Sequence, residues 1–190
     1  MDLMQDLVES FRLAGISLLR VVAPREMISP SFAWEVTTLS SSSGRVDVEI
    51  LRVENDCISR ANSAWFAMAK NLRVVNDRRE FLLAMENVFG DLYWSHVSLA
   101  REWDFIGVGA ALGVTGSREG FPGFALMSLD GNSALVGHSD QDCVSFTGVA
   151  DLKNIPELRE SAARLAFHSP HRGNDAAFSA KVWLGLHPSD

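Results

Sequence analysis

The chain has 190 residues, of which 47% are hydrophobic and 22% are charged. This composition provides enough apolar material for a folded core and excludes wholesale disorder. Lysine and arginine together number 17, against 24 aspartate and glutamate residues, which gives a formal net charge of −7. Because affinity for nucleic acids comes largely from cations that neutralise phosphates, we expect no nucleic-acid partner.

The first quarter of the sequence predicts a helix followed by a hairpin. Apolar residues recur at helical spacing through residues 3–22, which indicates an amphipathic helix. Residues 32–39 and 45–53 then alternate between apolar and polar side chains, as half-buried antiparallel strands do. The four serines and one glycine at 40–44 predict a turn between these two strands.

Two helices are predicted for the middle of the chain. A stripe from Ile58 to Leu72 follows possible caps at Asn55 and Asp56. Residues 77–92 give a second stripe, which starts at Asp77 and continues, less clearly, toward residue 105.

The last third of the sequence predicts mostly strands. The apolar run 124–129, the turn Asp130-Gly131 and the segment 133–138 form a hairpin signal, and residues 143–149 add another strand. Asn154 and Pro156 begin a helix, and the alternation over 178–186 predicts a final strand. The sequence therefore predicts a single α+β domain, 1–190, in which an N-terminal helix, a central helical segment and a C-terminal helix cover a mainly antiparallel sheet of about five strands.

Imidazole and carboxylate groups near one another suggest metal binding or acid/base catalysis. The candidate residues stand at the ends of predicted elements: His138, Asp140, Asp142, His168 and His171. Their spacing matches no known ligand motif, and a polar turn and a helix-ending loop explain them better. The sequence predicts no catalytic or metal site outright, and this set remains an alternative.

Two further sequence features bear on catalysis and on cofactor binding. Cys143 shares a predicted strand face with Ser145 and Thr147, and a cysteine nucleophile would need a base such as His168 close to it. The cysteines, at positions 57 and 143, lie in no metal-ligand or disulfide pattern. The glycine-rich stretch 107–113 lacks the spacing and the strand–helix context of a dinucleotide site, so we expect no such cofactor.

Large rings crowd one short stretch of the sequence. We take these aromatic residues as candidates for a ligand pocket or an interface, although ordinary core packing explains them too: Phe89, Tyr93, Trp94, Trp103 and Phe105.

The hypothesis that the sequence favours is a non-enzymatic interaction protein that binds another protein or itself as a homodimer. Catalytic motifs are missing, and an acidic protein can neutralise or escort a basic partner. The alternatives are an acid/base or metal-assisted enzyme and a small-molecule sensor with an aromatic pocket. We expect no bound cofactor and a cytoplasmic location, since the sequence shows no basic secretory leader and no apolar run of the ~18 residues that cross a membrane.

Overall fold

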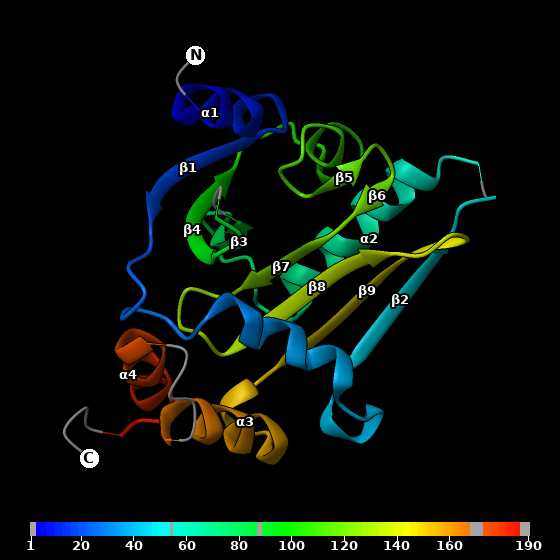
Figure 1. Cartoon of the computed structure of the whole chain (residues 1–190). Coiled ribbons are helices and arrows are strands. Elements are labelled where there is room, and N and C mark those ends of the chain that lie inside the picture. The colour runs from blue at the N-terminus through cyan, green and yellow to red at the C-terminus, as the bar shows by residue number, and fades with distance from the viewer. Residues whose placement is uncertain (1–2, 54, 87–88, 168–172, 187–190) are drawn as a thin grey trace.

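An antiparallel sheet forms the framework of the fold (Figure 1). The computed structural model describes residues 3–53, 55–86, 89–167 and 173–186. The main sheet has seven strands in the order β1-β4-β3-β7-β8-β9-β2, and all neighbouring strands are antiparallel. Its strands are β1 (Ile16–Val21), β2 (Val46–Leu51), β3 (Glu80–Glu86), β4 (Leu92–Leu99), β7 (Phe124–Met127), β8 (Ser133–Ser139) and β9 (Cys143–Ala150). A separate two-stranded sheet joins β5 (Gly116–Arg118) to β6 (Phe121–Pro122).

Helical segments cover both faces of the main sheet. One core cluster contains side chains from α1 (Leu3–Leu13), α2 (Cys57–Asn71) and the π-helical η3 (Phe105–Gly109). The other contains side chains from the 3₁₀ helix η1 (Pro30–Thr38), α3 (Pro156–Phe167) and α4 (Gly173–Trp183). Two short 3₁₀ turns, η2 (Ser41–Ser43) and η4 (Leu152–Asn154), complete the fold. In Figure 1, α2 lies behind the sheet and η1 crosses its front.

The predicted α+β class is confirmed, with seven strands in the main sheet in place of about five. The structure also confirms the strand within 45–53, the helix over 58–72 and the helix that begins at Pro156. The hairpin across Asp130-Gly131 is present as β7 and β8, and β9 follows it as expected. Gly131 has a φ of 68°, which is the left-handed conformation that this turn signal requires.

The prediction of one helix over residues 3–22 is wrong in its second half. The helix ends at Leu13, and β1 begins at Ile16. Gly15 separates them with a φ of 73°, and a Cβ at that position would lie 2.2 Å from the carbonyl oxygen of Glu102. Only glycine fits there, because it tolerates both the left-handed conformation and the close approach of another backbone segment.

The predicted strand over 32–39 is also wrong, and with it the hairpin to 45–53. Pro30 begins the helix η1 instead, because its fixed φ suits the first helical position. The hydroxyls of Thr37 and Thr38 donate to the carbonyl oxygens of Trp34 and Glu35, which helps to close the last turn.

The predicted helix over 77–92 is a hairpin of β3 and β4. Alternate residues of β3 point into opposite cores: Phe81, Leu83 and Met85 into one and Leu82 into the other. A strand that is buried on both faces is apolar almost throughout, so its sequence also satisfies helical spacing.

The predicted strand over 178–186 is wrong as well, because α4 runs through Trp183. Ala180 and Trp183 are buried on one side of this helix, at a spacing of three residues. The indole of Trp183 donates to the carbonyl oxygen of Gly131 at 2.7 Å, and this bond ties α4 to the β7–β8 turn.

Candidate functional site

The structure describes three of the five histidines and aspartates that the sequence singled out. His138 is partly buried near the end of β8, whereas Asp140 and Asp142 are exposed in the turn that follows. His168 and His171 lie outside the described residues. Within the described part of the chain, no group of three or more histidine, cysteine, aspartate or glutamate side chains could hold a metal ion.

His138 instead belongs to a row of side chains across three adjacent strands. It lies opposite Ser145 of β9, and Ser145 lies opposite Glu49 of β2. Cys143, two residues before Ser145, is 7% exposed, and its sulfur lies 3.4 Å from both the Glu49 Oε1 and the Ser145 hydroxyl. The thiol donates to the Glu49 carboxylate, so the sulfur is part of a polar contact that ties β9 to β2.

The backbone of β2 is open on its outer side. Strand β2 is the last strand of the sheet, and no described segment lies beyond it in Figure 1. Its register with β9 is continuous over all six residues, without a bulge. Such an edge presents unpaired N–H and C=O groups to any extended chain that approaches it.

Two hydrogen bonds identify the residues of β2 that face outward. The Arg52 N–H donates to the Asp142 carbonyl directly opposite, and the Cys143 carbonyl accepts from Asp140 on the β8 side. In an antiparallel ladder, every second pair of opposite residues exchanges backbone hydrogen bonds. Counting back from Arg52, the residues whose backbones bond to β9 are therefore Val46, Val48 and Ile50. The other three residues of the strand direct their N–H and C=O groups away from the sheet: Asp47, Glu49 and Leu51.

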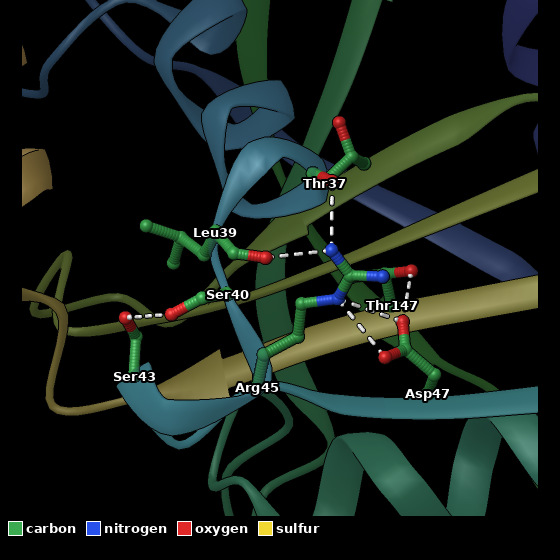
Figure 2. A network of polar contacts seen from close by, with 7 residues as sticks. All are labelled: Thr37, Leu39, Ser40, Ser43, Arg45, Asp47 and Thr147. Atoms are coloured by element: carbon green, nitrogen blue, oxygen red, sulfur yellow. Dashed lines mark hydrogen bonds and ion pairs between the residues drawn. The ribbon is translucent and has the colours of Figure 1, made fainter.

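The start of β2 is fixed by a polar network (Figure 2). The Arg45 Nε donates to the Asp47 carboxylate at 2.9 Å, and its Nη1 donates to the carbonyls of Thr37 and Leu39 at 2.9 and 2.7 Å. The Thr147 hydroxyl donates to Asp47 at 2.8 Å. The charge of Asp47 is therefore compensated, and the network joins β2 and β9 to the end of η1.

Glu49 and the neighbouring turn carry charges without such a partner. Within the described residues, no cationic side chain lies at ion-pair distance from Glu49, Asp140 or Asp142. Arg52 stands beside them, but its Nε and Nη1 donate to the backbone carbonyls of Asp140 and Gly120. The open edge therefore combines an outward backbone row with an excess of carboxylates. Asp47 and Glu49 share one face of β2, and the position of this strand at the edge of the sheet is what distinguishes them from ordinary solvated carboxylates.

The aromatic residues do not gather into one pocket. Trp94 is buried in the core on the η1 side, and its indole donates to the Ile28 carbonyl at 2.6 Å. Trp103 and Phe105 pack around Trp65 in the opposite core. Phe89, in contrast, is 86% exposed.

Two surface hollows nevertheless include some of these rings. A hollow of ≈ 550 Å³ between the connector 22–31, the start of β4 and α4 is lined in part by Tyr93 and Trp94. Burial raises the pKa of Tyr93 above its ordinary value. A second hollow of ≈ 920 Å³ beside α2 is lined in part by Phe66 and Trp103.

Side chains bind the amides at the start of the glycine-rich segment. Asp104 precedes it, and its carboxylate oxygens accept from the N–H groups of Gly107 and Val108 at 2.7 and 3.1 Å. The Asn62 side-chain oxygen accepts from the N–H groups of Phe105 and Ile106. These side chains satisfy the first amides of η3 internally.

Comparisons with protein-family models, with curated proteins and with solved structures find no significant match to this chain. None of the helices that the structure describes is both long and apolar enough to cross a membrane.

Proposed function

We propose that this chain is a non-enzymatic interaction protein that binds a basic segment of another protein at the β2 side of its sheet. The observation that carries the proposal is the open, bulge-free edge of β2 with the uncompensated carboxylate of Glu49 beside it. Asp140 and Asp142 extend the negative surface past the end of the strand.

The charge of the whole molecule supports the same partner. A net charge of −7 attracts a basic segment from a distance and accelerates its encounter with the surface. Exposed ion pairs contribute only about 0–1 kcal/mol each, so they do not provide the affinity by themselves. Close contacts at the edge of the sheet have to provide the rest.

A direct test measures the binding of a labelled lysine-rich peptide, with neutral and acidic peptides of equal length for comparison. We expect binding to the basic peptide alone, and a clear loss of affinity between about 50 and 300 mM salt. Glu49→Lys should weaken binding about five- to tenfold, since it replaces an attraction by a repulsion. Glu86→Lys, at the exposed end of β3, is the matched control and should change the affinity much less. Equal effects of the two variants would contradict the proposed location.

A small-molecule sensor is a second candidate, favoured by the hollow of ≈ 550 Å³ beside Tyr93 and Trp94. Its volume lies within the range of about 300–1,000 Å³ that is common for ligand pockets. A thermal-shift screen against metabolites, with tryptophan fluorescence as the second readout, tests this candidate. A ligand whose stabilising effect disappears in Ser179→Trp, a change that fills the hollow, would support it.

A further inference from the structure

We infer that the basic partner binds as an eighth, antiparallel strand beside β2. This inference rests on the proposed function and specifies how the partner is held. The outward N–H and C=O groups of Asp47, Glu49 and Leu51 provide one complete row of backbone hydrogen-bonding groups. Addition of an extended segment to such an edge is a common mode of peptide recognition.

The two faces of β2 define the side chains that the partner needs. Asp47, Glu49 and Leu51 project from one face. The partner residue opposite Glu49 is Lys or Arg, because no cation in the described residues pairs with that carboxylate, whereas Arg45 already pairs with Asp47. Val46 and Val48 project from the other face, where Val46 is 43% exposed and Val48 packs at the margin of a core. Partner residues opposite these valines are apolar, because they extend that core beside α2. The segment therefore carries a basic residue opposite Glu49, and the residues on either side of it, which project from the other face, are apolar.

The same geometry argues against a second copy of this chain as the occupant. An antiparallel pair of β2 strands about a twofold axis sets Glu49 opposite Glu49 of the other copy, or opposite Asp47 after a shift of two residues. Like charges that face each other across a strand pair are destabilising. The charge pattern favours a basic partner over self-pairing at this edge.

In an antiparallel pair, the face of the sheet on which a partner side chain lies also determines whether the N–H of that residue points toward β2 or away from it. Residues opposite Glu49 project toward the carboxylates and direct their own N–H groups toward β2. In an alternating Lys/Val peptide, the lysine amides therefore bond to β2 and the valine amides face solvent. This difference allows backbone pairing to be tested without any change of charge.

The experiment compares three forms of an alternating Lys/Val peptide: unmethylated, N-methylated at the lysine amides, and N-methylated at the valine amides. We expect the lysine-methylated form to bind at least tenfold more weakly and the valine-methylated form to bind within about threefold of the unmethylated one. On the protein, Leu51→Pro removes one outward N–H and no charge, so it should weaken binding more than Leu51→Ala does.

The outcomes distinguish a failure of strand addition from a failure of the proposed binding of basic segments. If all three peptides bind equally in a salt-dependent manner, strand addition is overturned and the proposed function survives. If no basic peptide binds, the proposed function fails together with the mode. Any other order among the three peptides overturns antiparallel addition.

Discussion

The two edges of the main sheet are built differently. At one edge, β1 carries an irregularity between Leu18 and Arg20, where Leu19 is an extra residue relative to β4. At the other edge, β2 keeps an unbroken register with β9 over six residues. A bulge twists an edge away from further pairing, and natural proteins use it to prevent association between sheets.

The arginine at the β2 edge is also held more firmly than the arginine at the β1 edge. Arg20 of β1 pairs with Glu26 on the following loop, and both side chains are about half exposed, at 50% and 46%. Arg45 before β2 is 27% exposed and binds two backbone carbonyls in addition to Asp47. Of the two edges of the main sheet, β1 is thus irregular and β2 is regular, and β2 is the edge at which we propose that another strand is added.

The largest expected effect tests whether successive amides of β2 point in turn toward β9 and away from it. Val48→Pro removes an amide that bonds to β9 and should lower the free energy of unfolding by about 2–4 kcal/mol. Glu49→Pro removes an outward amide and should cost about 1 kcal/mol, because proline is tolerated where an edge N–H faces solvent. Urea denaturation of both variants measures the difference, and equal losses would contradict the assigned direction of these amides.

The next effect concerns the network of Figure 2. Arg45→Ala removes hydrogen bonds to the carbonyls of Thr37 and Leu39 and leaves Asp47 without its cation. We expect a loss of about 2 kcal/mol in unfolding free energy, since hydrogen bonds to charged groups contribute about 1.5–3 kcal/mol. Arg20→Ala at the other edge is the control and should cost less. A larger loss at Arg20 would reverse the comparison.

Deletion of Leu19 tests whether the bulge protects β1. Without the extra residue, β1 can pair with β4 in continuous register and present a regular edge that includes the exposed Val21 side chain. We expect the deletion variant to self-associate more than the unchanged chain in sedimentation velocity at equal concentration. Leu19→Ala keeps the bulge and serves as the control. Identical sedimentation of the deletion variant and this control would show that the bulge has no protective role.

The smallest effect is the pH dependence of the pair at β1. The pKa of Glu26 lies below its ordinary value, mainly because the carboxylate accepts from the Arg20 guanidinium and also from the Ala23 N–H. A carboxylate with a lowered pKa adds stability above the pKa of the unfolded chain, near 4.5, and loses that contribution as the pH falls through the folded-state pKa. Arg20→Ala should raise the pKa of Glu26 toward its ordinary value in a carboxyl-detected NMR titration. An unchanged titration would show that the pair is not formed in solution.

Much of the fold follows from local signals in the sequence. The Asp130-Gly131 turn, the helix of residues 58–72 and the class of the fold are set by turn chemistry and by one-sided apolar patterns, which a single sequence shows directly. The β3–β4 hairpin escaped prediction because both of its faces are buried and periodicity does not distinguish such a strand from a helix. Gly15 was the available signal for the end of the first helix.

The candidate site was harder to predict for a different reason. The carboxylates of Asp47 and Glu49 stand out only when their strand is known to be the last in the sheet, and strand order depends on contacts between residues far apart in the sequence. The row of His138, Ser145 and Glu49 joins residues from three strands and has no local motif. The negative net charge, in contrast, follows from composition alone, and the proposal of a basic partner starts from it.

Amide hydrogen exchange of β2, measured by NMR with and without the alternating Lys/Val peptide, tests the central claim most directly. In the free protein, the amides of Val46, Val48 and Ile50 should be protected, and those of Asp47, Glu49 and Leu51 should exchange rapidly. With the peptide at about ten times its Kd, exchange of the second set should slow about tenfold, while the first set changes little. Unchanged exchange at these outward amides, with the peptide bound, would contradict strand addition at β2.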